Sequence, residues 1–109
     1  MSKLIDLRYD GKMWNLSHSG KVNRDRNPFK TDELIEIYLP MNVKSGDVVS
    51  GQYKLTVRGT ISLGSLLQMI TSSYREHSGG SISYVVNGLV HVYGLEKIGI
   101  NEYKLLLVR

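Results

Sequence analysis

The sequence predicts one α+β domain, in which a single amphipathic helix packs on one face of an antiparallel β-sheet built from hairpins. Apolar and polar residues alternate with a period of two over much of the chain, which is typical of half-buried strands. Asp10-Gly11 and Asn87-Gly88 each separate two such segments and favour type I′ hairpin turns. Only residues 62–78 have helical periodicity. A chain of 109 residues has the usual size of one domain, so we expect residues 1–109 to form a single unit.

The N-terminal part predicts a hairpin followed by a loop. Residues 4–9 and 12–16 alternate on either side of Asp10-Gly11 and are expected to pair as two strands. Residues 17–32 are rich in Ser, Gly and Asn and hold few large apolar side chains. This composition predicts a loop, which also carries the densest charge of the chain.

Two further strands are expected before the helix. In residues 33–39 the side chains of Ile35, Ile37 and Leu39 share one face, and Pro40 ends the strand or marks a sheet edge. Glycines and serines between positions 45 and 51 predict a turn. Alternation then resumes over residues 53–58.

The helix predicted for residues 62–78 has a clear start, face and end. Ser62 is suited to the N-cap, with Ile61 and Leu66 spaced as a hydrophobic staple. Gly79 and Gly80 provide the C-terminal stop. The residues expected on its buried face are Leu63, Leu66, Leu67, Ile70, Tyr74 and His77.

Three strands are expected after the helix. Residues 81–86 and 89–93 flank Asn87-Gly88, and residues 103–108 form a short apolar strand near the C-terminus. Gly94 and Gly99 are expected to interrupt the chain between the last two strands. The predicted order is therefore β-β-loop-β-β-α-β-β-β.

The residues expected of an enzyme are missing from the sequence pattern. There is no cysteine, and His18, His77 and His91 lack the spacing of a helical metal site. No nucleophile elbow or phosphate-binding loop is present. The acidic residues Asp32, Glu33 and Glu36 are interpreted as solvated carboxylates near a strand start. We therefore predict no catalytic residues, no metal site, no cofactor and no small-molecule substrate, and expect that the chain is not an enzyme.

A basic loop is the feature with the clearest physical meaning. The net charge is +4 and the isoelectric point about 9.4, which favours anionic partners. The candidate residues for binding an anionic surface are Lys21, Arg24, Arg26 and Lys30. On an acidic membrane they could together contribute about 3 to 4 kcal/mol at low salt. Phe29 places an apolar group beside this charge, whereas the plainer interpretation is a solvated loop that keeps the protein in solution.

Tyrosines on the predicted strands offer a different interpretation. Tyr53, Tyr84, Tyr93 and Tyr103 would suit an RNA-stacking sheet if they were exposed on one face. Because Tyr84 and Tyr93 alternate with valines, we interpret these tyrosines as core or edge residues.

Residues 53–95 resemble the core of rhabdovirus matrix proteins. The similarity is carried by the segments Tyr53–Gly59, Leu63–Ile70, Ser73–Gly79 and Gly88–Leu95. It implies a non-enzymatic viral protein that self-associates and works at the inner face of a membrane, beside the nucleocapsid. The chain lacks the family's Lys-rich N-terminal arm and Pro-Pro-x-Tyr motif, so the resemblance points to a small matrix-like or accessory protein.

These observations leave three functional hypotheses. The first is a matrix-like protein that forms homo-oligomers and binds acidic phospholipid membranes or nucleocapsid through the basic loop. The second is a nucleic-acid-binding or host-modulating protein of a virus or phage. The third is a protein–protein interaction module that uses an exposed edge strand, for which Tyr103–Val108 is a candidate. The early charges of the N-terminus do not fit a signal peptide, so we expect an intracellular location: host cytoplasm, inner membrane face or virion.

Overall fold

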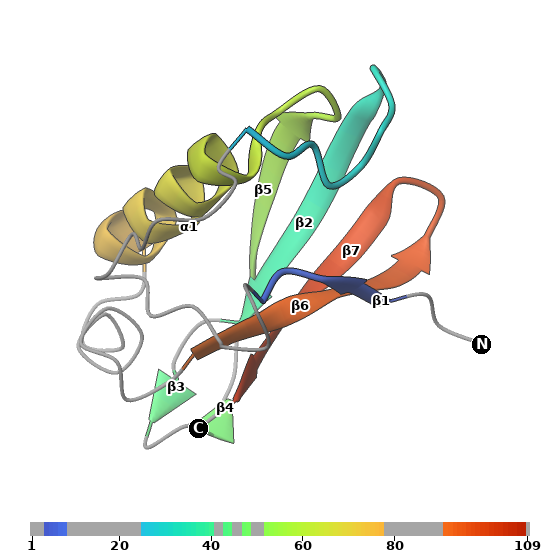
Figure 1. Cartoon of the computed structure of the whole chain (residues 1–109). Helices are drawn as coiled ribbons and strands as arrows, with labels where there is room; N and C mark the ends of the chain where they lie inside the picture. Colours follow the sequence, from blue (N-terminus) through green and yellow to red (C-terminus); the bar gives the residue numbers. More distant parts are fainter. Residues whose placement is uncertain are drawn as a thin grey trace.

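The computed structural model confirms the predicted α+β class. It describes residues 4–8, 25–40, 43–44, 47–48, 52–77 and 91–108, and the structural statements below refer to these residues. A five-stranded sheet carries one helix against it (Figure 1). The elements in chain order are β1 (Leu4–Asp6), β2 (Leu34–Pro40), β3 (Val43–Lys44), β4 (Asp47–Val48), β5 (Gln52–Arg58), α1 (Leu63–His77), β6 (His91–Gly99) and β7 (Glu102–Val108).

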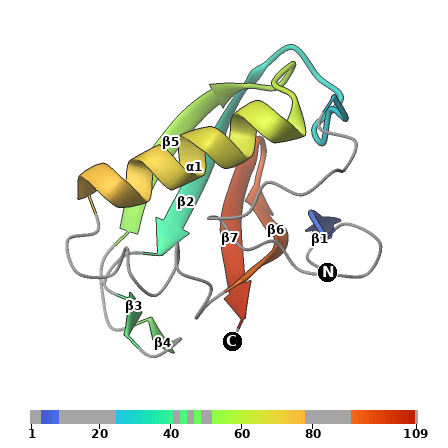
Figure 2. The ribbon, with the colours of Figure 1, turned by 60° about the vertical axis from the view of Figure 1, so that its left-hand side comes forward.

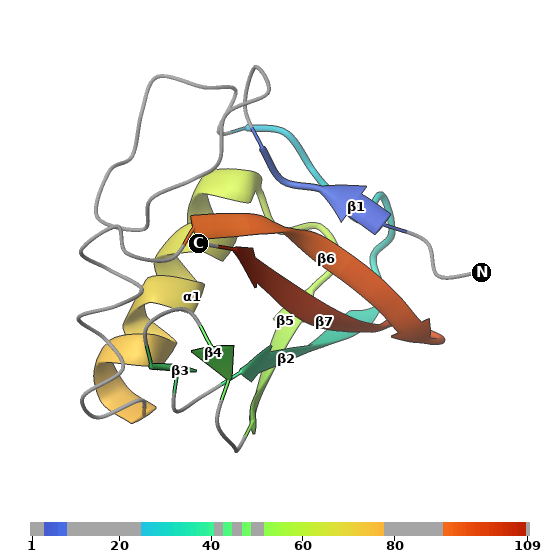
Figure 3. The same cartoon turned by 90° about the horizontal axis from the view of Figure 1, so that it is seen from below.

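The order of strands in the sheet is β1-β6-β7-β2-β5, and β3 and β4 form a separate two-stranded ribbon. All neighbouring strands run antiparallel except β2 and β7, which pair in parallel. Figure 3 shows β1 beside β6, at the end of the sheet far from β5. The suggestion that Tyr103–Val108 is an exposed edge strand is wrong, because β7 lies between β6 and β2. Within the described residues the edge strands are β1 and β5.

The core lies between the sheet and the helix, as the alternation predicts. On β2, Ile35, Ile37 and Leu39 are fully buried, whereas Leu34 is exposed on the opposite face. The buried face of α1 packs onto this layer and stabilises the domain by removing apolar surface from water (Figure 2). The helix residues buried in this core are Leu63, Leu66, Leu67, Ile70 and Tyr74.

The helix begins and ends within one residue of the predicted bounds. Ser62 precedes it as the N-cap: the Ser65 amide donates to Ser62 Oγ at 3.3 Å, and the Leu66 amide donates to the Ser62 carbonyl at 2.9 Å. Gly79, Gly80 and the His77 side chain lie outside the described residues.

The prediction that Gly94 interrupts the chain after Tyr93 is wrong, whereas Gly99 does end a strand. Strand β6 continues through Gly94 to Gly99 and pairs with β7, with register shifts between Val92 and Gly94 and between Lys97 and Gly99. A Cβ on Gly94 would stand 2.6 Å from the carbonyl oxygen of Ile5, so glycine allows β1 to approach β6 closely. Asn101 turns the hairpin with a φ of 56°, a conformation that asparagine tolerates.

The remaining predicted strands fall only partly within the described residues. The N-terminal strand is described as Leu4–Asp6, and the predicted turns at Asp10-Gly11 and Asn87-Gly88 lie outside. The same holds for the predicted strands 12–16 and 81–86.

The buried Tyr74 predicts a loss of stability at alkaline pH. Its hydroxyl donates to the Pro40 carbonyl at 2.7 Å, and burial raises its pKa above the ordinary value of 10.0. Because the pKa of Tyr74 is higher in the folded protein than in the unfolded chain, the protonated hydroxyl stabilises the folded state fully below pH 10. This stabilisation is lost as the pH rises through the folded-state pKa. We expect the free energy of unfolding to fall by about 1.4 kcal/mol per pH unit above pH 10 from this group alone.

Urea denaturation of Tyr74→Phe between pH 8 and about 11.5 checks this prediction. The variant should lose about 1 to 3 kcal/mol at pH 8, because the Pro40 carbonyl loses its donor. Its decline above pH 10 should be shallower than that of the wild type. Tyr93→Phe is the matched control, since that side chain is only half-buried. An unchanged alkaline slope in Tyr74→Phe would contradict the assignment.

Candidate anion-binding surface

The described part of the predicted loop is held in a defined path. Residues 25–33, here called the strap, run from beside the start of α1 to the start of β2 (Figure 1). The Leu63 amide donates to the Arg26 carbonyl at 2.7 Å, and the Gly59 amide donates to the Glu33 carbonyl at 2.8 Å. Both ends of the strap are therefore joined to the connection between β5 and α1.

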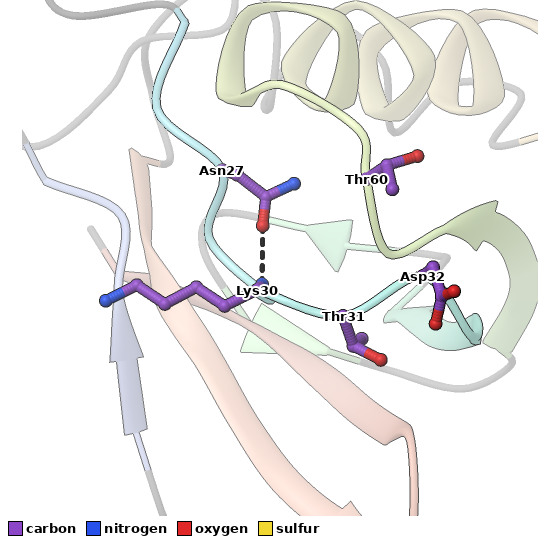
Figure 4. A pocket seen from close by; sticks show the side chains of 5 residues that line it. All are labelled: Asn27, Lys30, Thr31, Asp32 and Thr60. Carbon is purple, nitrogen blue, oxygen red and sulfur yellow. Dashed lines mark hydrogen bonds between the residues drawn. The ribbon is translucent and has the colours of Figure 1, made fainter.

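Asn27 fastens the middle of the strap to the same connection. Its side-chain Nδ2 donates to the carbonyls of Gly59 at 2.7 Å and Ile61 at 2.9 Å. Its Oδ1 accepts from the Lys30 amide at 2.5 Å (Figure 4). One side chain thus satisfies three backbone groups and fixes the turn that presents Lys30.

The two described members of the basic set lie on this strap. Arg26 and Lys30 are both exposed. Arg26 also donates through Nη2 to the backbone carbonyl of Asp6 at 2.5 Å, which ties the strap to β1. Lys30 adopts a φ of 57°, an uncommon conformation for lysine that the Asn27 hydrogen bond supports. Lys21 and Arg24 lie outside the described residues.

Two carboxylates, of Asp6 on β1 and Glu36 on β2, are paired with other cations. Arg8 Nη2 lies 2.6 Å from Asp6 Oδ2, and the Arg8 hydrogen bonds hold the pKa of Asp6 below its ordinary value. Lys54 Nζ lies 3.6 Å from Glu36 Oε1. Within the described part of the chain, Arg26 and Lys30 form no ion pair with a carboxylate, although the charge of Arg26 acts on the nearby Asp6 carboxyl. The strap also carries three exposed acidic residues, Asp25, Asp32 and Glu33.

The sequence places Phe29 beside Lys30 as an apolar group next to the charge, and the structure turns this side chain toward the core. It is partly buried and packs against the core. Its ring lies 5.2 Å from the Tyr103 ring, centroid to centroid, with a tilt of 52°. Phe29 therefore anchors the strap to the core and is only partly accessible to solvent.

Gly59 is required where the strap crosses the β5–α1 connection. A Cβ at this position would stand 2.5 Å from Thr31 Cγ2 and 2.6 Å from the Thr31 carbonyl oxygen. The backbone of the strap can lie this close only because position 59 has no side chain.

An open hollow of about 660 Å³ lies next to the strap, lined by Asn27, Lys30, Thr31, Asp32 and Thr60. In Figure 4 the Lys30 side chain points away from Thr60 and Asp32, and the Asn27 amide is committed to backbone groups. Among the described residues, no three His, Cys, Asp or Glu side chains are grouped to hold a metal ion.

The described tyrosines do not form a stacking face. Tyr103 is buried, and Tyr53 packs against the core. Tyr93 is half-buried, with the Arg8 guanidinium 4.7 Å from its ring centroid. Tyr84 lies outside the described residues.

The residues that sequence reasoning missed are Asn27 and Gly59. Asparagine next to proline is an ordinary loop signal, and nothing in the spacing shows that its amide reaches carbonyls more than thirty residues away. Gly59 likewise looks like a strand terminator. Only the tertiary arrangement shows that these two residues build the strap.

Comparison with known proteins gives no relative for this chain: no family model, curated protein or solved structure matches it. In the described residues, no helix has the length and apolar character needed to cross a membrane.

Proposed function

We propose that the chain is a non-enzymatic, matrix-like protein that attaches to acidic membrane surfaces through Lys21, Arg24, Arg26 and Lys30. The observation that carries this proposal is the strap itself. It presents Arg26 and Lys30 to solvent on a backbone fixed by Asn27, and neither side chain forms an ion pair with a described carboxylate, although Asp25, Asp32 and Glu33 are exposed on the same strap. Charges held in place on one surface act together on an anionic layer.

The expected strength of this attachment is modest. Each Lys or Arg near an acidic membrane contributes about 1 kcal/mol, so four residues supply about 3 to 4 kcal/mol at low salt. Because Phe29 is partly buried and packs against Tyr103, the proposed binding is electrostatic and does not rely on insertion of that ring. Self-association, which is part of the proposal, would multiply the weak contacts of single chains.

Flotation with vesicles tests the membrane attachment. The wild-type protein should float with vesicles of phosphatidylserine and phosphatidylcholine at about 20 mM salt, and should be released at about 0.5 M salt because exposed charges are then screened. It should not float with pure phosphatidylcholine. Absence of flotation on acidic vesicles at low salt would overturn the proposal.

A labelled single-stranded oligonucleotide, added in the same buffers, distinguishes the other anionic partner. Tight binding to the oligonucleotide, with a steep salt dependence and no flotation, would assign the basic residues to nucleic acid instead. Under the proposal, vesicle binding persists when the oligonucleotide is present at equal phosphate concentration.

A further inference from the structure

Among the described strands, β5 lies at one edge of the sheet. It pairs with β2 over all seven residues in regular antiparallel register, and no other described strand lies on its far side. The helix α1 lies beside it (Figures 1 and 2). An edge of this kind presents backbone groups that a further strand can pair with.

The register shows which backbone groups face outward. The Gly59 amide donates to the Glu33 carbonyl, so residues 33 and 59 form a hydrogen-bonded pair next to Leu34 and Arg58 in the β2–β5 register. Successive residues of a strand direct their backbone groups to opposite edges. The amide and carbonyl groups of Lys54 and Thr56 therefore face away from β2, toward the open edge.

A groove of about 430 Å³ runs between β5 and α1, next to this edge. Tyr53 and Leu55 line it from the strand. The residues that line it from the helix are Ser65, Gln68, Met69, Ser72, Ser73 and, as the one acidic group of the lining, Glu76. Met69 is 37% exposed, although it is a large apolar side chain on an otherwise polar helix face. Every second side chain of an added strand would point into this groove, where Leu55 and Met69 favour an apolar residue.

The positive charges on β5 favour an acidic peptide over a second copy of this strand. Lys54 and Arg58 are exposed on the face opposite the groove, and β5 contains no acidic residue. The Lys54–Glu36 pair is long and solvent-exposed, so it holds Lys54 only weakly. A second copy of β5 would bring further positive charge and no carboxylate. An acidic strand is complementary.

We propose that the edge of β5 and the β5–α1 groove bind an extended acidic peptide segment of a partner protein by strand addition. The peptide runs antiparallel to β5. Its acidic residues, four positions apart, stand opposite Arg58 and Lys54, and the residues between them place apolar side chains into the groove. This surface is separate from the strap, so peptide binding here does not depend on membrane attachment.

A designed peptide tests this proposal on the whole chain. The probe is acetyl-Glu-Val-Thr-Val-Glu-Val-Thr-amide, titrated into isotopically labelled protein and followed by amide chemical shifts. We expect saturable binding with a Kd below about 1 mM, shifts concentrated in Gln52–Arg58 and Ser65–Ser73, and slower amide exchange at Lys54 and Thr56. No saturation, or shifts centred on β1, would overturn the proposal.

Paired variants separate strand addition from general charge attraction. Thr56→Pro removes an outward amide and should weaken binding at least about tenfold, whereas Thr56→Val keeps the amide and should bind like the wild type. Lys54→Glu with Arg58→Glu should also weaken it at least about tenfold, whereas Lys97→Glu with Lys104→Glu, on other strands, should change it less than about threefold. Equal effects of the two charge pairs, or equal binding of a peptide with Lys in place of Glu, would contradict the assignment.

Discussion

Gly59→Ala is expected to lower the free energy of unfolding by about 3 kcal/mol, a large fraction of the stability of a domain of this size. The added Cβ would meet Thr31 Cγ2 at 2.5 Å and the Thr31 carbonyl oxygen at 2.6 Å. Relief requires the strap to move away from the β5–α1 connection. That movement would stretch the hydrogen bonds from Gly59 to Glu33 and from Asn27 to Gly59.

Urea denaturation at neutral pH measures this loss, with Thr60→Ala as the matched control. Thr60 is the exposed neighbour of Gly59, and its replacement should change stability by less than about 0.5 kcal/mol. If Gly59→Ala is as stable as Thr60→Ala, the strap is not held against the connection as described.

Removing all four basic side chains is expected to reduce partitioning onto acidic vesicles by about two to three orders of magnitude at low ionic strength. The substitutions are chosen to preserve the fold: Lys21→Ser, Arg24→Ser, Arg26→Gln and Lys30→Asn. Glutamine at position 26 keeps a side-chain donor for the Asp6 carbonyl, and asparagine tolerates the φ of 57° at position 30.

Vesicle titration followed by sedimentation gives the partition coefficients, and the wild type measured at about 0.5 M salt serves as the reference for screened charges. The variant at low salt should bind no better than this reference. Retention of most of the binding at low salt would show that other residues carry it.

Much of the fold follows from local patterns in the sequence. Alternation places Ile35, Ile37 and Leu39 in the core, and the helix from Leu63 to His77 begins where the Ser62 cap and its apolar periodicity predict. Local patterns gave wrong strand bounds where contacts between distant segments determine the structure. Gly94 looked like a strand break, yet it lies inside β6 because β1 needs close approach there.

The order of the strands in the sheet also could not be predicted from the sequence. The parallel pairing of β7 with β2 joins segments more than sixty residues apart, and no local signal reports it. The same pairing places β7 inside the sheet and leaves β5 at the edge. For the candidate site, charge alone identified Arg26 and Lys30, but the role of Phe29 was misjudged because its packing against Tyr103 is a long-range contact.

The most direct test of the account compares two pairs of substitutions that remove the same charge from different places. Arg26→Gln with Lys30→Asn removes two charges from the strap, and Lys97→Gln with Lys104→Gln removes two exposed charges from β6 and β7. On acidic vesicles at low salt, the strap pair should lose about 30-fold in partition coefficient, since two residues contribute about 2 kcal/mol. The sheet pair should lose less than about threefold. Equal losses would contradict the account, because net charge and not the strap would then determine binding.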